Sequence, residues 1–314
     1  MIKSDSGLGR AVQRTLILAL TILICGCGAS TKIDEFIPTR IVSVGDALSY
    51  QGTAANGYND RLTVNGDGTV NNWLVELATN YGITFDPTAT AFAKPNARVA
   101  DLPSQLNGFV PQVGDMLVIQ GGNNDILFHT QAVINKTETP AQALSTMTSL
   151  GYTFQLFARA QLSNFSHILI LNANDLKGSM FAQNNAAAFA ASAPSYTGGI
   201  TQFILDLTRA FNSAIISNAG TYASGQGVRL FDAEGLLLTA DLQGYGITTA
   251  GLTMEACSGF NVGLNCNYNP TTSTGTADPN YAAYLYADDT NLTPVGHRLL
   301  GNLAYLFLRS PKGW

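Results

Sequence analysis

The hydrophobic residues of this chain form short continuous runs that alternate with longer stretches of helical periodicity. Each short run ends at glycine, asparagine or aspartate, which is typical of a buried strand. We predict four such strands, at Ile41–Val44, Met116–Gln120, His167–Leu171 and Val228–Phe231. The helical stretches predict long helices over residues 70–81, 140–162, 198–219 and 293–308.

Strands that alternate with helices predict an α/β protein, a three-layer α/β/α sandwich with a central parallel sheet. In such sheets ligands bind beyond the carboxyl ends of the strands. Two polar segments, 45–47 and 122–125, follow predicted strands directly, so we expect both at the same edge of the sheet. Residues 243–283 are rich in Gly, Asn and Thr and predict a long loop over that edge.

The composition of the chain indicates which kinds of binding partner to expect. The chain has 314 residues, 46% of them hydrophobic and 12% charged, which suits one domain over residues 40–314 with a full core. Its net charge is −5 and no basic patch stands out, so we expect no nucleic-acid partner. With three histidines in the whole chain, we expect neither a metal site nor another cofactor.

The N-terminal residues resemble an export signal. Basic residues precede a short apolar run at 16–24, which is too short to span a bilayer comfortably. Ile24-Cys25-Gly26-Cys27 follows and is similar to a bacterial lipobox. We predict a lipoprotein signal peptide over residues 1–26, lipidation of Cys27 and a tether over 27–39. An ordinary secretory signal, cut near Ala29, is the alternative.

A lipidated Cys27 would hold the protein on a membrane surface. No acidic residue directly follows this cysteine, which resembles the pattern sorted to the outer membrane of Gram-negative bacteria. We therefore expect an exported protein anchored in the outer membrane. Without the leader, Cys257 and Cys266 are the cysteines that remain besides Cys27, and in an exported chain we expect them to form a disulfide.

Gly45-Asp46-Ala47-Leu48-Ser49 and Gly122-Asn123-Asn124-Asp125 together resemble the SGNH/GDSL family of ester hydrolases, whose fold is flavodoxin-like. The resemblance implies that Ala47 stands at the position of the nucleophilic serine. It also implies that the Asn124 side chain donates to the oxyanion. A second oxyanion donor is expected at the family's glycine pair, which Pro95-Asn96 replaces here. Proline has no backbone N–H, so the backbone N–H of Asn96 is the donor that this pair can still offer to the oxyanion.

The C-terminal segment carries the rest of the resemblance. Asp288 matches the family's catalytic Asp, Asn291 falls on its catalytic His, and His297 matches a second, later His. A neutral amide cannot take a proton at neutral pH. Two interpretations of His297 are open, a replacement base or a helix residue hydrogen-bonded to Asp288 or Asp289. Ser49 is two residues from the nucleophile position, so we expect its side chain to point elsewhere.

Two functions follow from these substitutions. The first is an ester hydrolase of the lipase, esterase or carbohydrate-deacylase type; if Ala47 is an engineered change from serine, the natural protein is an ordinary member of the family. Alternatively, the chain is a natural pseudoenzyme that binds an acyl ester, lipid or acylated glycan in the former cleft. Ala47, Pro95-Asn96 and Asn291 are three departures, and one engineered change would account for only one of them. The sequence therefore favours a family fold over present catalysis.

Overall fold

The computed structural model describes residues 36–51, 72–217, 227–235, 242–252, 254–257, 278–288, 290–310 and 314. The chain divides into a compact unit, Ile37–Gly313, and a second unit made of Met1–Phe36 and Trp314. In the second unit the rings of Phe36 and Trp314 meet edge to face, 5.7 Å apart. Among the helices in the described ranges, none has the length and apolarity needed to cross a membrane.

The compact unit is built on a parallel sheet of four strands in the order β1-β2-β3-β4. The strands are β1 (Arg40–Val44), β2 (Asp115–Gln120), β3 (His167–Leu171) and β4 (Val228–Phe231). All four were predicted from the sequence, and β1 and β2 begin one residue earlier than expected. Their near-continuous apolar character fits a sheet that is covered on both faces.

A fifth segment extends this sheet beyond β1. Ala91 forms a parallel bridge with Ser43, which also pairs with Val118 of β2, so Ala91 lies at the opposite edge of β1. Across the sheet the order is therefore the Ala91 segment, β1, β2, β3 and β4. If these five segments are numbered along the chain, the order is 2-1-3-4-5. This is the flavodoxin-like order, in which the crevice for ligands opens between the first and third strands. The predicted three-layer α/β/α fold is confirmed.

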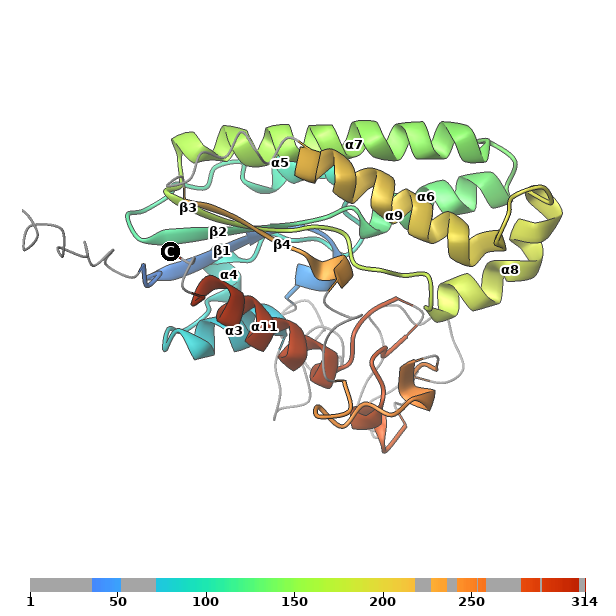
Figure 1. Cartoon of the computed structure of the whole chain (residues 1–314). Helices are drawn as coiled ribbons and strands as arrows, with labels where there is room; N and C mark the ends of the chain where they lie inside the picture. Colours follow the sequence, from blue (N-terminus) through green and yellow to red (C-terminus); the bar gives the residue numbers. More distant parts are fainter. Residues whose placement is uncertain are drawn as a thin grey trace, which may run out of the picture. The chain divides into compact units, whose positions relative to one another are not determined.

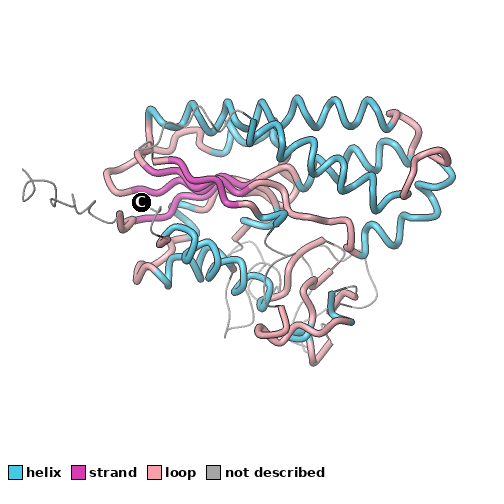
Figure 2. The backbone as a smooth tube through the Cα atoms, in the orientation of Figure 1, coloured by secondary structure: helices cyan, strands magenta, loops and turns pink. Residues whose placement is uncertain are grey.

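Helices cover both faces of the sheet (Figures 1 and 2). One face carries α5 (Leu102–Gln105), α6 (Asn123–Ile134), α7 (Pro140–Ala160) and α9 (Gly199–Ser217), with α8 (Met180–Ser192) packed beside α9. The other face carries α3 (Trp73–Asn80), α4 (Pro87–Thr90) and α11 (Pro294–Leu308). Single 3-10 turns are η2 (Ala47–Ser49), η4 (Val99–Asp101), η5 (Gln161–Ser163), η7 (Ala250–Leu252) and η9 (Tyr281–Ala283).

The four predicted long helices correspond to α3, α7, α9 and α11, with ends that differ by a few residues. Capping residues explain where two of them begin. Thr139 and Gln142 form a capping box ahead of α7, and Thr293 caps α11 by accepting from the N–H of Gly296. Each helix then has proline in its first turn, where the missing N–H costs nothing.

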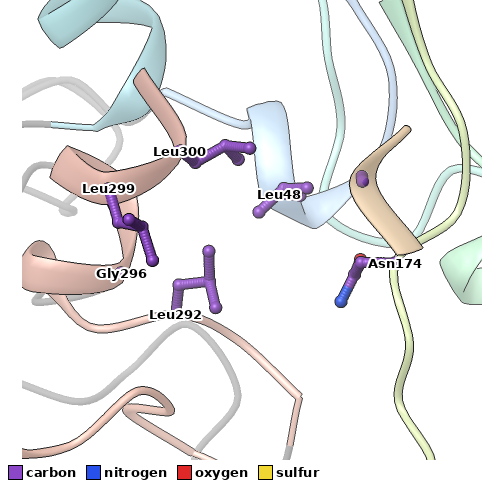
Figure 3. Close-up of a pocket in the computed structure, with 7 residues that line it drawn as sticks. Leu48, Asn174, Leu292, Gly296, Leu299 and Leu300 are labelled. Carbon is purple, nitrogen blue, oxygen red and sulfur yellow. The ribbon is translucent and has the colours of Figure 1, made fainter. Parts of the chain in front are cut away.

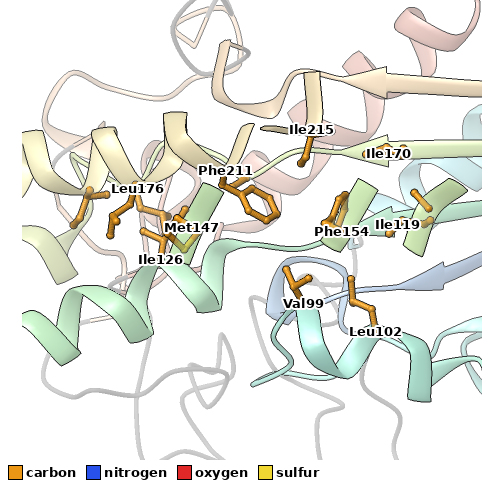
Figure 4. Packing of buried hydrophobic residues seen from close by; sticks show 14 of the residues in the cluster. Val99, Leu102, Ile119, Ile126, Met147, Phe154, Ile170, Leu176, Phe211 and Ile215 are labelled. Carbon is orange, nitrogen blue, oxygen red and sulfur yellow. The ribbon is translucent and has the colours of Figure 1, made fainter. Parts of the chain in front are cut away.

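The main core lies between the sheet and the layer of α6, α7 and α9 (Figure 4). Phe154 of α7 and Phe211 of α9 meet edge to face there, with ring centroids 5.5 Å apart. Ile119 of β2 and Ile170 of β3 are fully buried in the same cluster. This packed layer fixes the carboxyl ends of β2 and β3, where the polar segments predicted from the sequence begin.

Candidate functional site

The turn after β1 holds Ala47 at the carboxyl edge of the sheet. The Gln105 side chain binds the backbone of Gly45 on both sides, accepting from its N–H at 2.8 Å and donating to its carbonyl at 2.9 Å. The N–H of Asp46 donates to Gln120 of β2 at 3.2 Å. The Asp46 carboxylate in turn accepts from the N–H of Leu48 at 3.1 Å and caps η2. Ala47 is therefore placed by buried hydrogen bonds to two neighbouring elements.

Two carboxyl groups are buried beneath this edge. Burial raises the pKa of Asp46 to about 6, although N–H donors from residues 48, 123 and 124 and the Gln120 side chain act against the shift. Burial also raises the pKa of Asp125 to about 6, helped by the neighbouring charge of Asp46. The Asp125 carboxylate accepts from the N–H of Val99 at 3.0 Å. Both carboxyls thus hold backbone in place under the site.

The turn after β2 begins a helix. Gly122 has φ 103°, in the left-handed region, and a Cβ there would lie 2.5 Å from the ring of Phe211. It is followed directly by α6, so Asn123 and Asn124 stand in the first helical turn. Gly122 is therefore the N-cap of a twelve-residue helix.

Asn124 is tied to the segment that carries the second predicted oxyanion donor. Its amide nitrogen donates to the carbonyls of Pro95 and Ala97, each at 2.9 Å. A side-chain amide has two N–H bonds, so both are used in this structure. Asn96 lies exposed in the turn between these two carbonyls. The Asn124 side chain therefore holds this turn against the start of α6.

Asp288 and Asn291 form a hydrogen-bonded pair. The Asn291 amide nitrogen lies 3.1 and 3.0 Å from the two carboxylate oxygens of Asp288, and its backbone N–H donates to one of them at 2.8 Å. Asp288 has no exposed surface. An orienting acid that receives an N–H from its neighbour is the arrangement of a catalytic Asp–His pair. Here the neighbour is an amide, which the acid can orient but cannot turn into a base.

His297 lies in the first turns of α11 and is 1% exposed. Its Nδ1 accepts from the backbone N–H of Trp73 at 3.4 Å. Trp73 is the first residue of α3, where helical N–H groups lack intrahelical partners. His297 therefore links α11 to the start of α3, and its role as a replacement base stays a prediction.

A polar recess of about 20 Å³ brings several of these positions together. Ala47, Asn124 and Asn291 all line it, with Asp288 bonded behind Asn291. The remaining lining residues are Asp46, Leu48, Asn123, Leu127, Asn174, Leu176 and Thr290. The recess opens at the carboxyl ends of β1 and β2, the crevice that the strand order predicts. We refer to it below as the polar recess.

A second hollow, of about 10 Å³, lies beside the first and is lined mainly by aliphatic side chains (Figure 3). Leu48 and Asn174 line both hollows. The other residues of this apolar recess are Ala233, Leu292, Gly296, Leu299 and Leu300, most of them from α11 and the segment before it. The site therefore has a polar part and an apolar part that meet at two shared residues.

Asn174 is the main site residue that the sequence analysis missed. It follows β3, and its backbone N–H donates to the side chain of Asn123 at 3.2 Å. The rule that identified segments 45–47 and 122–125, polar residues directly after a strand, applies equally to residues 172–175. Other expectations are untested: Cys27 and Cys266 lie outside the described residues, and Cys257 is buried. Ser49 is fully buried.

The sequence matches no protein-family model and no curated protein. Similar solved structures include the acetylxylan esterase Axe2 of Geobacillus stearothermophilus, with TM-score 0.46, 11% identity and coverage of 86% of this chain and 94% of that one. A lipase of Streptomyces rimosus has TM-score 0.40 and 18% identity over 64% of this chain and 82% of that one. A lipolytic G-D-S-L protein of Veillonella parvula has TM-score 0.44 and 12% identity over 86% and 98%. Likeness at this level does not define an activity for the chain.

Proposed function

We propose that this chain is an SGNH/GDSL-type ester-hydrolase scaffold that binds an acyl ester, lipid or acylated glycan without hydrolysing it. One observation carries the proposal: Ala47 and Asn291 face the same polar recess, and Asn291 is held by Asp288 as a catalytic histidine would be. The sequence resemblance assigns the nucleophile to position 47 and the base to position 291. Both substitutions therefore fall on the reacting atoms of one site.

Each missing group removes a separate step of ester hydrolysis. The methyl group of Ala47 cannot attack a carbonyl carbon, and the amide of Asn291 cannot take a proton from a nucleophile. The side-chain N–H groups of Asn124 are directed at the carbonyls of Pro95 and Ala97, so neither is directed at an oxyanion. The site therefore lacks a nucleophile, a base, and a side-chain donor that would stabilise the negative charge of the transition state.

The supporting structure around these groups is intact. Gly45 and Asp46 remain bonded to Gln105 and Gln120, and Asp288 remains buried and bonded. A site that keeps its shape but lacks reactive groups retains the capacity to bind. The polar recess and the apolar recess together offer the mixed lining that ligand sites commonly have.

Hydrolysis by the full, unmutated chain is the direct test. The chain is incubated with p-nitrophenyl acetate and p-nitrophenyl butyrate, and nitrophenolate release is compared with that of buffer and of denatured protein. We expect no release above these controls. Turnover would contradict the proposal, and its loss in His297→Ala, with folding unchanged, would then identify His297 as the base.

We also propose that the chain is an outer-membrane lipoprotein. The support is the basic and apolar leader followed by Cys27. Expression of the full chain in a Gram-negative host with radiolabelled palmitate should give a labelled protein in the outer-membrane fraction. Cys27→Ala should lose the label, whereas Cys25→Ala should keep it. Absence of label from the unmutated chain would favour the ordinary secretory signal.

A further inference from the structure

Asn174 projects a polar group into the place where the two recesses meet. It follows β3 and is only 6% exposed, yet it lines both the polar and the apolar recess. In Figure 3 its amide nitrogen lies at the free end of the side chain. A donor in this position is suited to contact a molecule that enters the site.

The hydrogen bonds around Asn174 fix which way its amide points. The backbone N–H of Asn174 donates to the Asn123 side-chain oxygen at 3.2 Å, so that oxygen must face Asn174. The Asn123 amide nitrogen then donates to the side-chain oxygen of Asn174. With its oxygen used in this way, Asn174 directs its Nδ2 away from Asn123. The orientation follows from a backbone donor, which cannot be flipped.

Neighbouring asparagines at the same edge of the sheet differ from Asn174. The amide nitrogen of Asn172 donates to Asp232 at 2.8 Å, that of Asn212 donates to Ala173 and Glu234, and that of Asn124 binds two carbonyls. Within the described ranges, Nδ2 of Asn174 has no such partner. This nitrogen is not one of the fully buried atoms without a partner, so a molecule that enters the recess can reach it and offer it an acceptor.

The apolar recess beside Asn174 restricts what that ligand carries. Its aliphatic lining is made of Leu48, Ala233, Leu292, Gly296, Leu299 and Leu300. Its cavity volume of about 10 Å³ is well below the range for drug-sized ligands, so only a small group can enter it. A short hydrocarbon chain fits this lining, whereas a charged or strongly hydrated group would lose its water without compensation.

We propose that Asn174 orients the ligand of this site by donating Nδ2–H to the carbonyl oxygen of a short-chain acyl group. The hydrocarbon of that group lies in the apolar recess, and the alcohol part extends into the polar recess past Ala47. This assignment rests on the proposed function, since it assumes that the site binds an acyl compound. Beyond the proposed function, the assignment names the residue that orients the ligand and restricts its acyl group to a short chain.

Binding of unlabelled methyl esters to the full chain tests this assignment. Methyl butyrate and methyl octanoate are titrated and followed by ligand-observed NMR. We expect methyl butyrate to bind at least about 10-fold more tightly than methyl octanoate. Asn174→Asp keeps the oxygen that Asn123 binds and removes the donor, so it should weaken methyl butyrate binding by at least about 10-fold.

Two variants of α11 provide the matched test of the apolar recess. Leu300→Phe fills the recess and should weaken methyl butyrate binding by a similar factor. Leu306→Phe makes the same change on the exposed side of the helix, where Leu306 is 60% exposed, and should leave binding unchanged. Equal binding by Leu300→Phe and the unmutated chain would overturn the placement of the hydrocarbon.

The remaining outcomes separate this inference from the proposed function. Unchanged binding by a folded Asn174→Asp variant, or no binding of methyl butyrate by the unmutated chain, would overturn the role of Asn174 and leave the absence of hydrolysis standing. Release of butyrate by the unmutated chain would contradict the proposed function, and weaker binding by Asn174→Asp would still support Asn174. If that variant fails to fold, the NMR signals of the Asn174 side-chain amide in the unmutated chain provide the test. A change in their chemical shift on addition of methyl butyrate supports the contact, and no change overturns it.

Discussion

The turns after β1 and β2 and the C-terminal segment 288–297 supply opposite sides of one recess, but they are held in different ways. The first region is bonded across elements, with Gly45 and Asp46 joined to Gln105 and Gln120. In the second, Asp288 accepts from the backbone N–H groups of Thr290 and Asn291, two and three positions further along the chain, and His297 accepts from the N–H of Trp73. The first region is bonded to neighbouring elements of the sheet layer, whereas the second combines local hydrogen bonds with a contact to α3.

Each region has well-formed supporting contacts, and the proposed function places one missing reactive group in each. Ala47 needs no partner of its own, because the backbone around it is fixed by neighbours. Asn291 by contrast satisfies a buried carboxylate, so it is structural as well as part of the lining. The comparison predicts that position 47 tolerates change more easily than position 291.

The largest expected effect is a gain of hydrolysis. Ala47→Ser combined with Asn291→His restores a nucleophile and a base around the existing Asp288, since a histidine at 291 offers an N–H to the same carboxylate. We expect the double variant to hydrolyse p-nitrophenyl acetate at least about 100-fold faster than either single variant, because a positioned base contributes about 10²–10⁴-fold. Equal rates in the single and double variants would show that the two regions do not cooperate.

The tight packing of the first region predicts a large loss of stability in Gly122→Ala. The new Cβ would meet the Phe211 ring at 2.5 Å on a backbone with φ 103°, so we expect the free energy of unfolding to fall by about 3 kcal/mol. Gly178→Ala is the matched control, since a Cβ at Gly178 meets no atom within 4 Å. Urea unfolding measures both. Equal losses of unfolding free energy in the two variants would contradict the close contact between residue 122 and Phe211.

Asp46 predicts a pH dependence of stability. Its folded pKa of about 6 exceeds the ordinary value of 3.8, so its contribution is full below about pH 4 and is lost as the pH rises through 6. Relative to Asp46→Asn, the unmutated chain should lose about 2–3 kcal/mol of unfolding free energy between pH 4 and pH 7. Urea unfolding at a series of pH values measures the difference.

Asp86 is the matched control for this pH series. Hydrogen bonds from Thr88 and Ala89 lower the pKa of its exposed carboxyl, so its contribution is present above the ordinary pKa and is lost as the pH falls. Asp86→Asn should therefore change the pH dependence in the opposite direction to Asp46→Asn. Changes of the same sign in both variants would refute the assignment of the effect to burial of Asp46.

The smallest expected effects compare the two reacting positions directly. Ala47→Ser should change the free energy of unfolding by less than about 0.5 kcal/mol, because Ala47 is only half-buried. Asn291→Ala removes donors from the buried carboxylate of Asp288 and should cost about 1–3 kcal/mol. Urea unfolding of the two variants decides. A larger loss for Ala47→Ser would reverse the proposed contrast between the regions.

Much of the fold was predictable because the apolar runs of β1 to β4 and the periodicity of α7, α9 and α11 are strong local signals. The helices α6 and α8, of 12 and 13 residues, were not predicted, whereas the shorter α3 was. In α8, alanine and asparagine occupy most positions, so no apolar face marks the helix. At the start of α6 the sequence is polar, so no apolar face marks the beginning of this helix either.

The parts of the site that belong to sequence motifs were predictable. The positions of Ala47, Asn124 and Asn291 were expected to lie together from their spacing and their resemblance to a family, and all three line the polar recess. The partners of Asn124 and the open donor of Asn174 were not predictable. Both depend on which carbonyls and amides from distant segments meet beyond the strands, and residue types alone do not specify that.

Covalent labelling of the full, unmutated chain tests the central claim most directly. The chain and the Ala47→Ser, Asn291→His double variant are treated with a fluorophosphonate, and intact mass spectrometry measures adduct formation. The proposed binding function without hydrolysis predicts an adduct on the double variant, at residue 47, and an unchanged mass for the unmutated chain. An adduct on the unmutated chain, at Ser49 or Thr290 for example, would contradict it.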